Sequence, residues 1–432
     1  MSGTHAHTVA YVAGSEQPSE PPPINSSGAM GWLRENLFSS WSNSLITLAC
    51  IAFLAWILPG LVDWAIMKSV WNASSLVECR EKIIAAHGEG AHGACWAVIR
   101  ERYNQLLYGF YPPELQWRPN VALVLLVVAM VPVLFRNIRI SLLYAVAGIL
   151  ALYVLAALFR GDISLIVSPP VFVALVAAAV GFVFGNPEQR QRWIVFTLVY
   201  PLIAYFLLWG GLGLEPVESS KFGGFMLTMI IGVTGIAFSL PLGVLLALGR
   251  QSKLPILQMI CVSFIEFIRG VPLITLLFVA STLLNYFLPP GTSFDLILRV
   301  LIMVTLFASA YMAEVVRGGL AALPKGQYEA ADTLGLGYWQ SMRLIILPQA
   351  LKISIPGIVN TFIGLFKDTT LVAIIGLLDP LGLTRPIRSD ADWNGIVWEL
   401  YGFIGLLFFI CCFAMSRYSM FLEQRLRATE RR

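Results

Sequence analysis

Charged residues are scarce in this chain. Lys, Arg, Asp and Glu make up 12% of its 432 residues, whereas an ordinary soluble domain has about a quarter. Hydrophobic residues make up 57%. This composition excludes an ordinary soluble protein and predicts an all-α integral membrane protein, because a spanning helix satisfies its own backbone hydrogen bonds. The net charge of +4 carries no argument for nucleic-acid binding.

Groups for catalysis and nucleotide binding are also lacking. The sequence has four His residues, and Ser, His and Asp do not gather into a nucleophile set. No Gly-x4-Gly-Lys-Ser/Thr loop is present to cradle phosphates. We therefore predict that the chain is not an enzyme and holds no cofactor or metal. Any ATP hydrolysis has to come from a separate chain.

Long apolar runs are what the sequence does contain, and about 20 apolar residues are needed to cross the membrane. Ten candidate spans cover 43–67, 120–135, 140–159, 163–185, 193–213, 223–249, 255–287, 296–316, 353–378 and 396–418. From Arg136 onward, Lys and Arg are concentrated in alternate loops, which the positive-inside rule assigns to the cytoplasm together with both termini. The basic segment from Lys68 to Pro119 disagrees, but it lies outside if ten spans alternate.

Composition also divides the chain into segments. Residues up to Ser27 are rich in Pro, Ser and Gly and cannot bury enough apolar area to fold alone. The expected segments are a disordered cytoplasmic tail with an interfacial stretch (1–42), accessory spans (43–215) with an outside loop (68–119), a second membrane unit (220–424) and a basic cytoplasmic tail (425–432).

The outside loop contains Cys79 and Cys95, sixteen positions apart, with His87 and His92 between them in a Gly-rich run. Disulfides persist outside the cell membrane, so we predict a Cys79–Cys95 bridge. A Cys2His2 metal site is the alternative, although the spacing fits no zinc pattern. The other cysteines lie in apolar runs, where a thiol behaves as a small hydrophobe: Cys50, Cys261, Cys411 and Cys412.

The loop between the spans at 296–316 and 353–378 carries the clearest functional pattern, Glu-Ala-Ala-x3-Gly-x9-Ile-x-Leu-Pro. The residues that form it are Glu329, Ala330, Ala331, Gly335, Ile345, Leu347 and Pro348. We expect two short helices, with Glu329 in the first turn of the first helix, where the positive helix end favours an acid. Gly335 should end that helix, and Pro348 should stop the second.

Small alanines at 330 and 331 permit close approach of a partner, and Ile345 and Leu347 should fix the second helix to the membrane. A rigid helical knob on the cytoplasmic side is suited to a groove in a separate protein. An amphipathic hairpin lying on lipid is the alternative.

This loop resembles the coupling loop, or EAA loop, of the permeases of ATP-binding cassette (ABC) importers. Flanking segments narrow the resemblance to polar amino-acid permeases of the histidine and glutamine type. They are Glu266-Phe-Ile-Arg269-Gly270-Val-Pro272-Leu, Tyr311-Met-Ala-Glu314-Val-Val-Arg317-Gly-Gly, Gly326-Gln327, Pro348-Gln349-Ala350 and Lys367-Asp368-Thr369-Thr370-Leu371. The long N-terminal extension and the stretch from Cys412 to Met420 also resemble the M-type subunits of general L-amino acid importers of Gram-negative bacteria.

The resemblance implies a five-helix type I importer core over 220–424, in a multi-pass protein of the bacterial inner membrane. Such a chain moves L-amino acids by alternating access, beside a homologous second permease. A periplasmic binding protein delivers the substrate, and an ATPase dimer holds ATP and Mg²⁺. An ion-coupled secondary transporter and a membrane anchor without a transport path are the alternatives.

Charged side chains within the spans are costly and are candidates for the substrate path. Arg269 or Lys367 would meet the substrate carboxylate, and Glu266 or Asp368 would meet its ammonium group. The alternative is that these four residues pair with one another. Asn360, seven residues before Lys367, could add a hydrogen bond. Near the cytoplasmic end, an i,i+3 pair should brace the docking loop: Glu314 and Arg317.

Overall fold

The computed structural model describes residues 28–134, 200–211, 213–283, 286 and 294–430. In these ranges the chain is helical, with β-structure limited to isolated bridges, which confirms the all-α prediction. The chain divides into two units, Met1–Val70 with Arg80–Ala94 and Trp71–Cys79 with Cys95–Arg432. The tail through Ser27, the spans at 140–159 and 163–185 and the first part of 193–213 lie outside the described residues.

The first unit is dominated by one long apolar helix. It contains α1 (Gly28–Asn36) and α2 (Trp41–Val62), which continues into the π-turn η2 (Asp63–Met67). Ser40 caps α2, because its hydroxyl accepts a hydrogen bond from the backbone N–H of Asn43 at 3.2 Å. Together α2 and η2 form 27 residues of high mean hydropathy, enough to cross a membrane at the predicted place.

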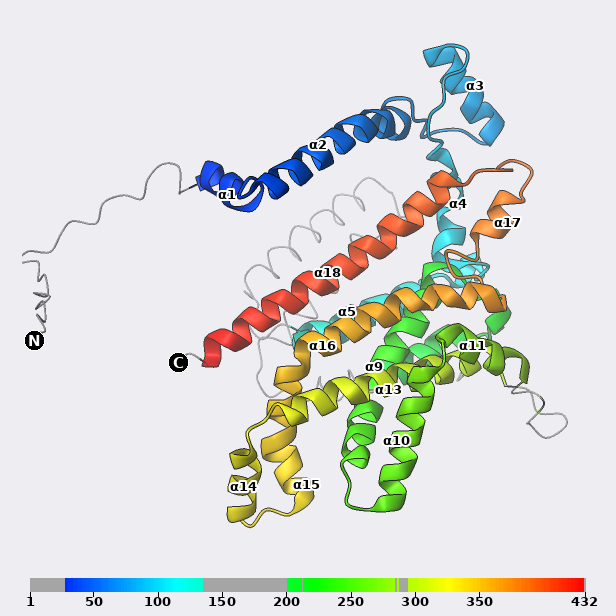
Figure 1. Cartoon of the computed structure of the whole chain (residues 1–432). Coiled ribbons are helices and arrows are strands. Elements are labelled where there is room, and N and C mark those ends of the chain that lie inside the picture. The colour runs from blue at the N-terminus through cyan, green and yellow to red at the C-terminus, as the bar shows by residue number, and fades with distance from the viewer. Residues whose placement is uncertain (1–27, 135–199, 212, 284–285, 287–293, 431–432) are drawn as a thin grey trace, which may run out of the picture. The chain divides into compact units, whose positions relative to one another are not determined.

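The second unit contains the other apolar helices of the described chain. They are α5 (Trp117–Leu134), Tyr200–Trp209, α9 (Gly224–Arg250), α10 (Pro255–Gly270), α11 (Leu273–Phe278), α13 (Leu296–Ala321), α16 (Leu347–Asp368) and α18 (Trp398–Glu430). Figure 1 shows α13 packed beside α9, α10 and α16. Among the described spans, α13 has the largest buried share. Gly243 of α9 permits close contact with α13, because a Cβ there would lie 2.6 Å from the Cβ of Met312.

The predicted span over 255–287 is a bent pair of helices in the described structure. Its helix breaks after Gly270, and α10 and the following α11 with the π-turn η6 (Val279–Leu283) are bent by 102°. Pro272 has no N–H to continue the helix, and it disfavours helical backbone at the preceding residue. Val271 is accordingly extended, with φ −109° and ψ 131°.

Backbones approach closely at one end of the second unit. Gly109, which follows α4 (Ala97–Tyr108), has φ +68°, and a Cβ there would lie 2.4 Å from the Cα of Gly223. Gly223 forms a parallel bridge with Leu378, and Gly109 forms an antiparallel bridge with Phe222. These contacts hold α4, the start of α9 and the segment after α16 together.

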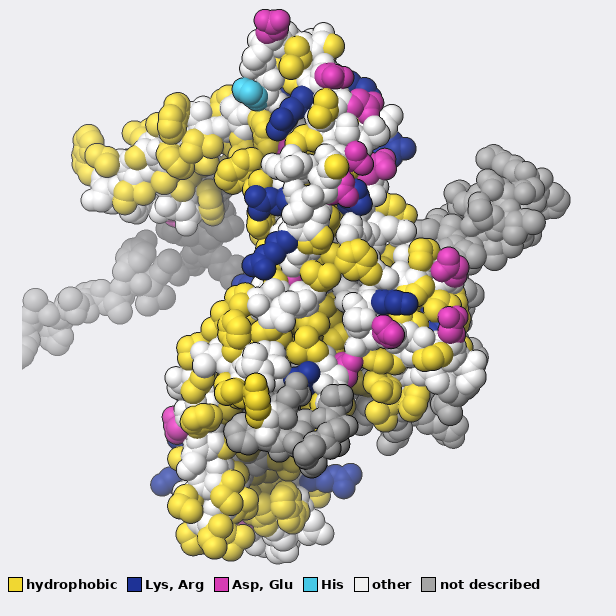
Figure 2. Space-filling view, turned by 90° about the vertical axis from the view of Figure 1, so that its right-hand side faces the viewer, with side chains coloured by type: hydrophobic (Ala, Val, Ile, Leu, Met, Phe, Trp, Pro, Cys, Tyr) yellow, Lys and Arg dark blue, Asp and Glu magenta, His cyan; other side chains and the backbone are white. Residues whose placement is uncertain are grey.

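Hydrophobic side chains cover much of the face seen in Figure 2. The large hydrophobic side chains that are more than half exposed in the second unit include Ile256, Met259 and Phe267 of α10 and Phe409 of α18. A soluble protein does not expose apolar surface on this scale. The exposed helices are therefore suited to lipid or to another membrane subunit.

Candidate functional site: the coupling loop and a charge network

The coupling loop (Glu329–Pro348) begins within α14 (Lys325–Thr333). Glu329 lies in the second turn of α14, so its predicted first-turn position is wrong. The helix starts earlier because Pro324, with a fixed φ of −59°, forms its N-cap. Ala331 is fully buried, whereas Glu329 and Ala330 are exposed. Only one of the two alanines therefore packs inside this chain.

Gly335 ends α14, as the sequence predicted. The N–H of Leu336 donates to the carbonyl oxygen of Ala331 at 3.3 Å, and the N–H of Gly335 donates to that of Asp332 at 3.0 Å. This pattern is a Schellman motif, which needs left-handed backbone at its glycine. Gly335 has φ +69°, and no atom lies within 4 Å of a Cβ built on it. The backbone conformation, not lack of space, requires glycine here.

The second half of the loop contains α15 (Tyr338–Ser341) and the π-turn η7 (Met342–Ile346), which runs directly into α16. The prediction that Pro348 stops a helix is wrong, because Pro348 lies in the first turn of α16. In the π-turn, the N–H of Leu347 donates to the carbonyl oxygen of Met342. This wider turn accommodates the proline ring, which in a regular α-helix would clash with the carbonyl group four residues earlier.

Buried apolar side chains anchor the loop to the rest of the second unit. Ile346 is fully buried and packs in one cluster with Met342, Ala350 and Leu320. The sequence prediction named its neighbours Ile345 and Leu347, which are only half-buried. An i,i+4 pattern from Met342 through Ile346 to Ala350 was the available signal for the buried face.

Hydrogen bonds also connect the helices at the two ends of the coupling loop. Gln349 donates from Nε2 to Oε1 of Gln327 at 2.9 Å, which joins α16 to α14. The hydroxyl of Tyr328 donates to the carbonyl oxygen of Leu320 at 3.3 Å. Burial raises the pKa of Tyr328, so its phenol stays protonated and able to donate near neutral pH.

Large apolar side chains nevertheless project from the loop. Leu334, Trp339 and Leu344 are 71%, 67% and 64% exposed. Tyr338 and Trp339 also border a cavity of about 970 Å³ beside the turn between α9 and α10, where Ser252 and Lys253 lie. Apolar side chains held on a rigid, polar-rimmed helical element are suited to a protein interface.

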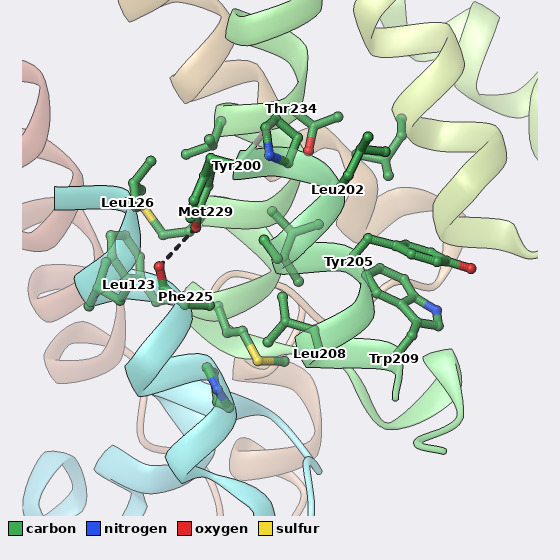
Figure 3. Close-up of a pocket in the computed structure, with 18 of the residues that line it drawn as sticks. Leu123, Leu126, Tyr200, Leu202, Tyr205, Leu208, Trp209, Phe225, Met229 and Thr234 are labelled. Atoms are coloured by element: carbon green, nitrogen blue, oxygen red, sulfur yellow. Dashed lines mark hydrogen bonds between the residues drawn. The ribbon is translucent and has the colours of Figure 1, made fainter. Parts of the chain in front are cut away.

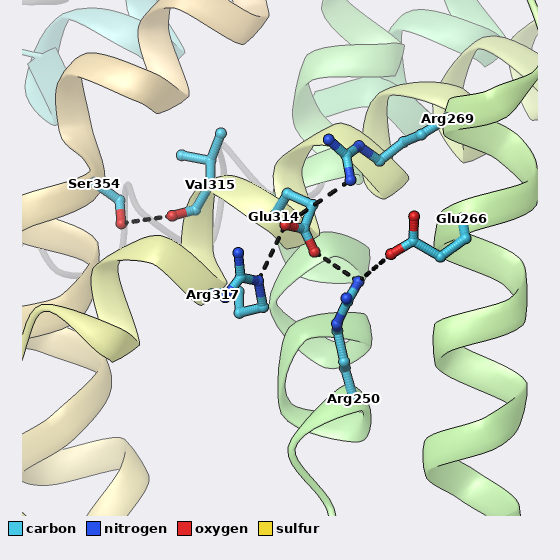
Figure 4. A network of polar contacts seen from close by, with 7 residues as sticks. All are labelled: Arg250, Glu266, Arg269, Glu314, Val315, Arg317 and Ser354. Atoms are coloured by element: carbon cyan, nitrogen blue, oxygen red, sulfur yellow. Dashed lines mark hydrogen bonds and ion pairs between the residues drawn. The ribbon is translucent and has the colours of Figure 1, made fainter.

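A second feature is the charge network of Arg250, Glu266, Arg269, Glu314 and Arg317 (Figure 4). Arg250 Nη1 lies 2.9 Å from Oε1 of Glu266 and 2.7 Å from Oε1 of Glu314. Arg317 Nε lies 3.0 Å from Oε2 of Glu314, which is the predicted i,i+3 pair. Arg269 Nη1 lies 3.8 Å from the same oxygen, and its guanidinium lies 5.6 Å from the ring centre of Tyr311.

The predicted mutual pairing of Glu266, Arg269, Lys367 and Asp368 is therefore wrong in the described structure. Glu266 pairs with Arg250 of α9, and Arg269 pairs with Glu314 of α13. Both of these helices pack against α10. Lys367 is exposed and Asp368 half-buried, and neither forms an ion pair with another described residue. Asn360 is exposed on the same helix, α16. Arg250, which contacts both Glu266 and Glu314, was not among the residues predicted for the site.

Cys79 and Cys95 are joined by a disulfide, with their Cα atoms 6.1 Å apart. We call residues 71–79 and 95–116 of the second unit the disulfide cap. The N–H of Cys95 donates to Oε1 of buried Glu399, in the first turn of α18, at 2.9 Å. Arg102 forms a 2.7 Å ion pair with Asp390. Across the described ranges, no group of three or more His, Cys, Asp and Glu residues is arranged to hold a metal ion.

An apolar cavity of about 340 Å³ lies between α5, Tyr200–Trp209 and α9 (Figure 3). Leu123, Tyr205 and Met229 line it, and the hydroxyl of Tyr200 donates to the carbonyl oxygen of Ala122. Among the described residues that line this cavity, none is charged. An amino-acid zwitterion needs charged or strongly polar partners, which this described lining does not offer.

Comparisons with known proteins identify a family model and several relatives. Residues 239–428 match the family model described as "Binding-protein-dependent transport system inner membrane component". The chain is 52% identical over 428 residues to the glutamate/glutamine/aspartate/asparagine transport system permease protein BztC of Rhodobacter capsulatus, covering 95% of this chain and 96% of that protein. It is 44% identical over 409 residues to the inner membrane amino-acid ABC transporter permease protein YhdY of Escherichia coli, covering 94% and 96%.

A solved structure described as an amino acid ABC transporter with histidines contains a similar chain. It is 28% identical, with a TM-score of 0.42, and the match covers 46% of this chain and 91% of that one.

Proposed function

This chain belongs to the family of amino-acid ABC importer permeases, and on that premise we propose that its coupling loop receives a separate ATPase whose cycle drives L-amino acid import. This proposal rests on the structure of the loop, in which Leu334, Trp339 and Leu344 are exposed while Ile346 is buried and anchors it. The order of the charged loops favours a cytoplasmic position for it and for both termini. No observation favours the alternative of an ion-coupled secondary transporter.

The proposed complex contains two ATPase subunits, a second homologous permease and a binding protein on the periplasmic side. Exposed hydrophobic faces of α10 and α18 support a membrane partner. The printed name of one relative gives glutamate, glutamine, aspartate and asparagine as its substrates. We propose the same class of small polar L-amino acids for this chain.

The first experiment is purification of the native complex in detergent. We expect an ATPase to copurify, and amino-acid uptake to stop when ATP is depleted while the ion gradient is kept. Uptake that continues without ATP would contradict the proposal. Gly335→Asp should retain hydrolysis but lose uptake, because it adds a negative charge at the proposed interface.

For the substrate path, we propose that Lys367 meets the substrate carboxylate and Asp368 its ammonium, with Asn360 nearby on α16. The support is that Lys367 is exposed and, among the described residues, lacks an ion-pair partner. In contrast, Glu266 and Arg269 are already paired with α9 and α13. An unpaired charge within a spanning helix has a high free-energy cost, and contact with a charged substrate would offset that cost.

Lys367→Met tests this role by keeping the length of the side chain while removing its charge. We expect the KM for the amino acid to rise by about tenfold, since one charged contact contributes about 1.5–3 kcal/mol. Lys221→Met, at an exposed lysine before α9, is the matched control and should leave the KM unchanged. An unchanged KM in Lys367→Met would remove Lys367 from the path.

A further inference from the structure

Arg250 occupies the last position of α9, but its side chain does not extend freely into solvent. Only 24% of it is exposed, and one nitrogen, Nη1, contacts carboxylates on two other helices. Glu266 belongs to α10 and Glu314 to α13 (Figure 4). A single guanidinium thus connects three helices, which a shorter or neutral side chain could not do.

The two carboxylates depend on Arg250 to different degrees. Glu314 also contacts Arg317 and Arg269, so it keeps cationic partners when Arg250 is lost. In the described part of the chain, the one ion pair of Glu266 is with Arg250. Removing Arg250 therefore removes the ion pair between α9 and α10, whereas Glu314 keeps its ion pairs with Arg269 and Arg317.

The network lies between two functional elements. Glu314 is seven residues before the end of α13, about 10 Å along the helix, and α14 follows directly. Tyr328 of α14 is hydrogen-bonded back to Leu320 of α13. On the other side, Arg269 precedes the 102° break between α10 and α11. The charge network therefore joins the coupling loop to the break through side chains in contact.

We propose that Arg250 is a positioning residue that transmits movement of the coupling loop to the bent α10–α11 pair. When an ATPase displaces α14, the end of α13 moves with it, and Glu314 carries Arg250 and hence Glu266 of α10. The contacts are partly exposed, so they can exchange partners between the states of a transport cycle. The inference rests on the proposed docking of an ATPase at the coupling loop.

The test measures amino acids transported per ATP hydrolysed by the complete transporter in proteoliposomes. Arg250→Met should lower this ratio by about tenfold. Coupling between two sites of a protein typically changes an equilibrium by about 5- to 150-fold. The KM for the amino acid should stay within about twofold, because Arg250 contacts no substrate in this mechanism. Arg250→Lys, which keeps the charge, should recover part of the ratio.

Glu266→Gln and the double variant complete the cycle. If both residues act through their mutual contact, the double variant should match Arg250→Met, since the shared interaction is lost only once. Additive losses, or transport and hydrolysis that fall in proportion, would overturn the inference. Copurification of the ATPase separates the two proposals: without bound ATPase the docking proposal fails, whereas bound ATPase with an unchanged ratio refutes only the role of Arg250.

Discussion

The two ends of the second unit are built differently. At the disulfide cap, a disulfide and charged contacts within the chain hold the structure: the N–H of Cys95 donates to Glu399, and Arg102 pairs with Asp390. Large apolar side chains are exposed at both ends, Trp71 and Val77 at the cap and Trp339 and Leu334 at the coupling loop. The cap is cross-linked covalently, whereas the coupling loop is anchored by apolar packing and presents its exposed face to the proposed partner.

This difference predicts different results from substitution. Changes at the cap should alter the stability of this chain, because its contacts are internal. Changes on the exposed face of the coupling loop should alter binding and coupling while the chain itself stays folded.

The largest expected effect comes from Gly335→Val. A β-branched residue at φ +69° is strongly disfavoured, so the Schellman turn that ends α14 should rearrange. Uptake should fall by at least about tenfold while the amount of protein in the membrane is unchanged. Gly335→Asn is the matched control, since Asn adopts left-handed backbone more readily. Equal loss in both variants would show that the backbone conformation is not the cause.

The next effect concerns the cap. Replacing Cys79 and Cys95 together by Ser should destabilise the cap by about 3 kcal/mol, the value for a closed loop of about 15 residues. Faster hydrogen exchange in α4 would report this loss. Cys50→Ser, at an exposed free cysteine of α2, provides the control. If α4 exchanges at the same rate in both proteins, the disulfide does not hold the cap.

Trp339→Ala tests the other end. Truncation of a central aromatic residue at an interface costs more than about 1 kcal/mol, so ATPase affinity should fall by about tenfold. The melting temperature should not change, because Trp339 is 67% exposed. Trp398→Ala, at a similarly exposed residue that begins α18, should leave ATPase affinity intact. A melting shift without an affinity change would assign Trp339 to folding.

The smallest effect is a pH dependence at Asp379, which is fully buried between α16 and α17 (Thr384–Arg388). Burial raises its pKa from 3.8 to about 6, although backbone N–H groups of Gly382 and Leu381 oppose the shift. A raised carboxyl pKa means that the folded protein holds the proton more tightly, so stability is lost as pH rises through about 6.

Between pH 5 and 7 this loss should be about 1 kcal/mol. Hydrogen exchange around Asp379 at the two pH values measures it. Asp379→Asn cannot titrate and should remove the difference. The same pH dependence in both proteins would assign it to another group.

Local features were predictable because they depend on short stretches of sequence. The apolar run of α2 and the termination of α14 at Gly335 follow from hydrophobic length and glycine conformation. The prediction failed at Pro348, where a π-turn accommodates the proline, and at Glu329, where Pro324 starts the helix earlier. Both errors came from choosing one helix boundary when the neighbouring residues allowed another.

Sequence alone determined the membrane class and the family resemblance, and it gave the Glu-Ala-Ala pattern on which the proposed coupling loop rests, since each is encoded in residues close together in the chain. Only the tertiary structure decided which charges meet. Arg250 reaches Glu266 and Glu314 because α9, α10 and α13 pack together, and the same packing leaves Lys367 without a pairing partner among the described residues. Ion pairs between helices depend on the relative rotation of their faces, which spacing within one helix does not specify.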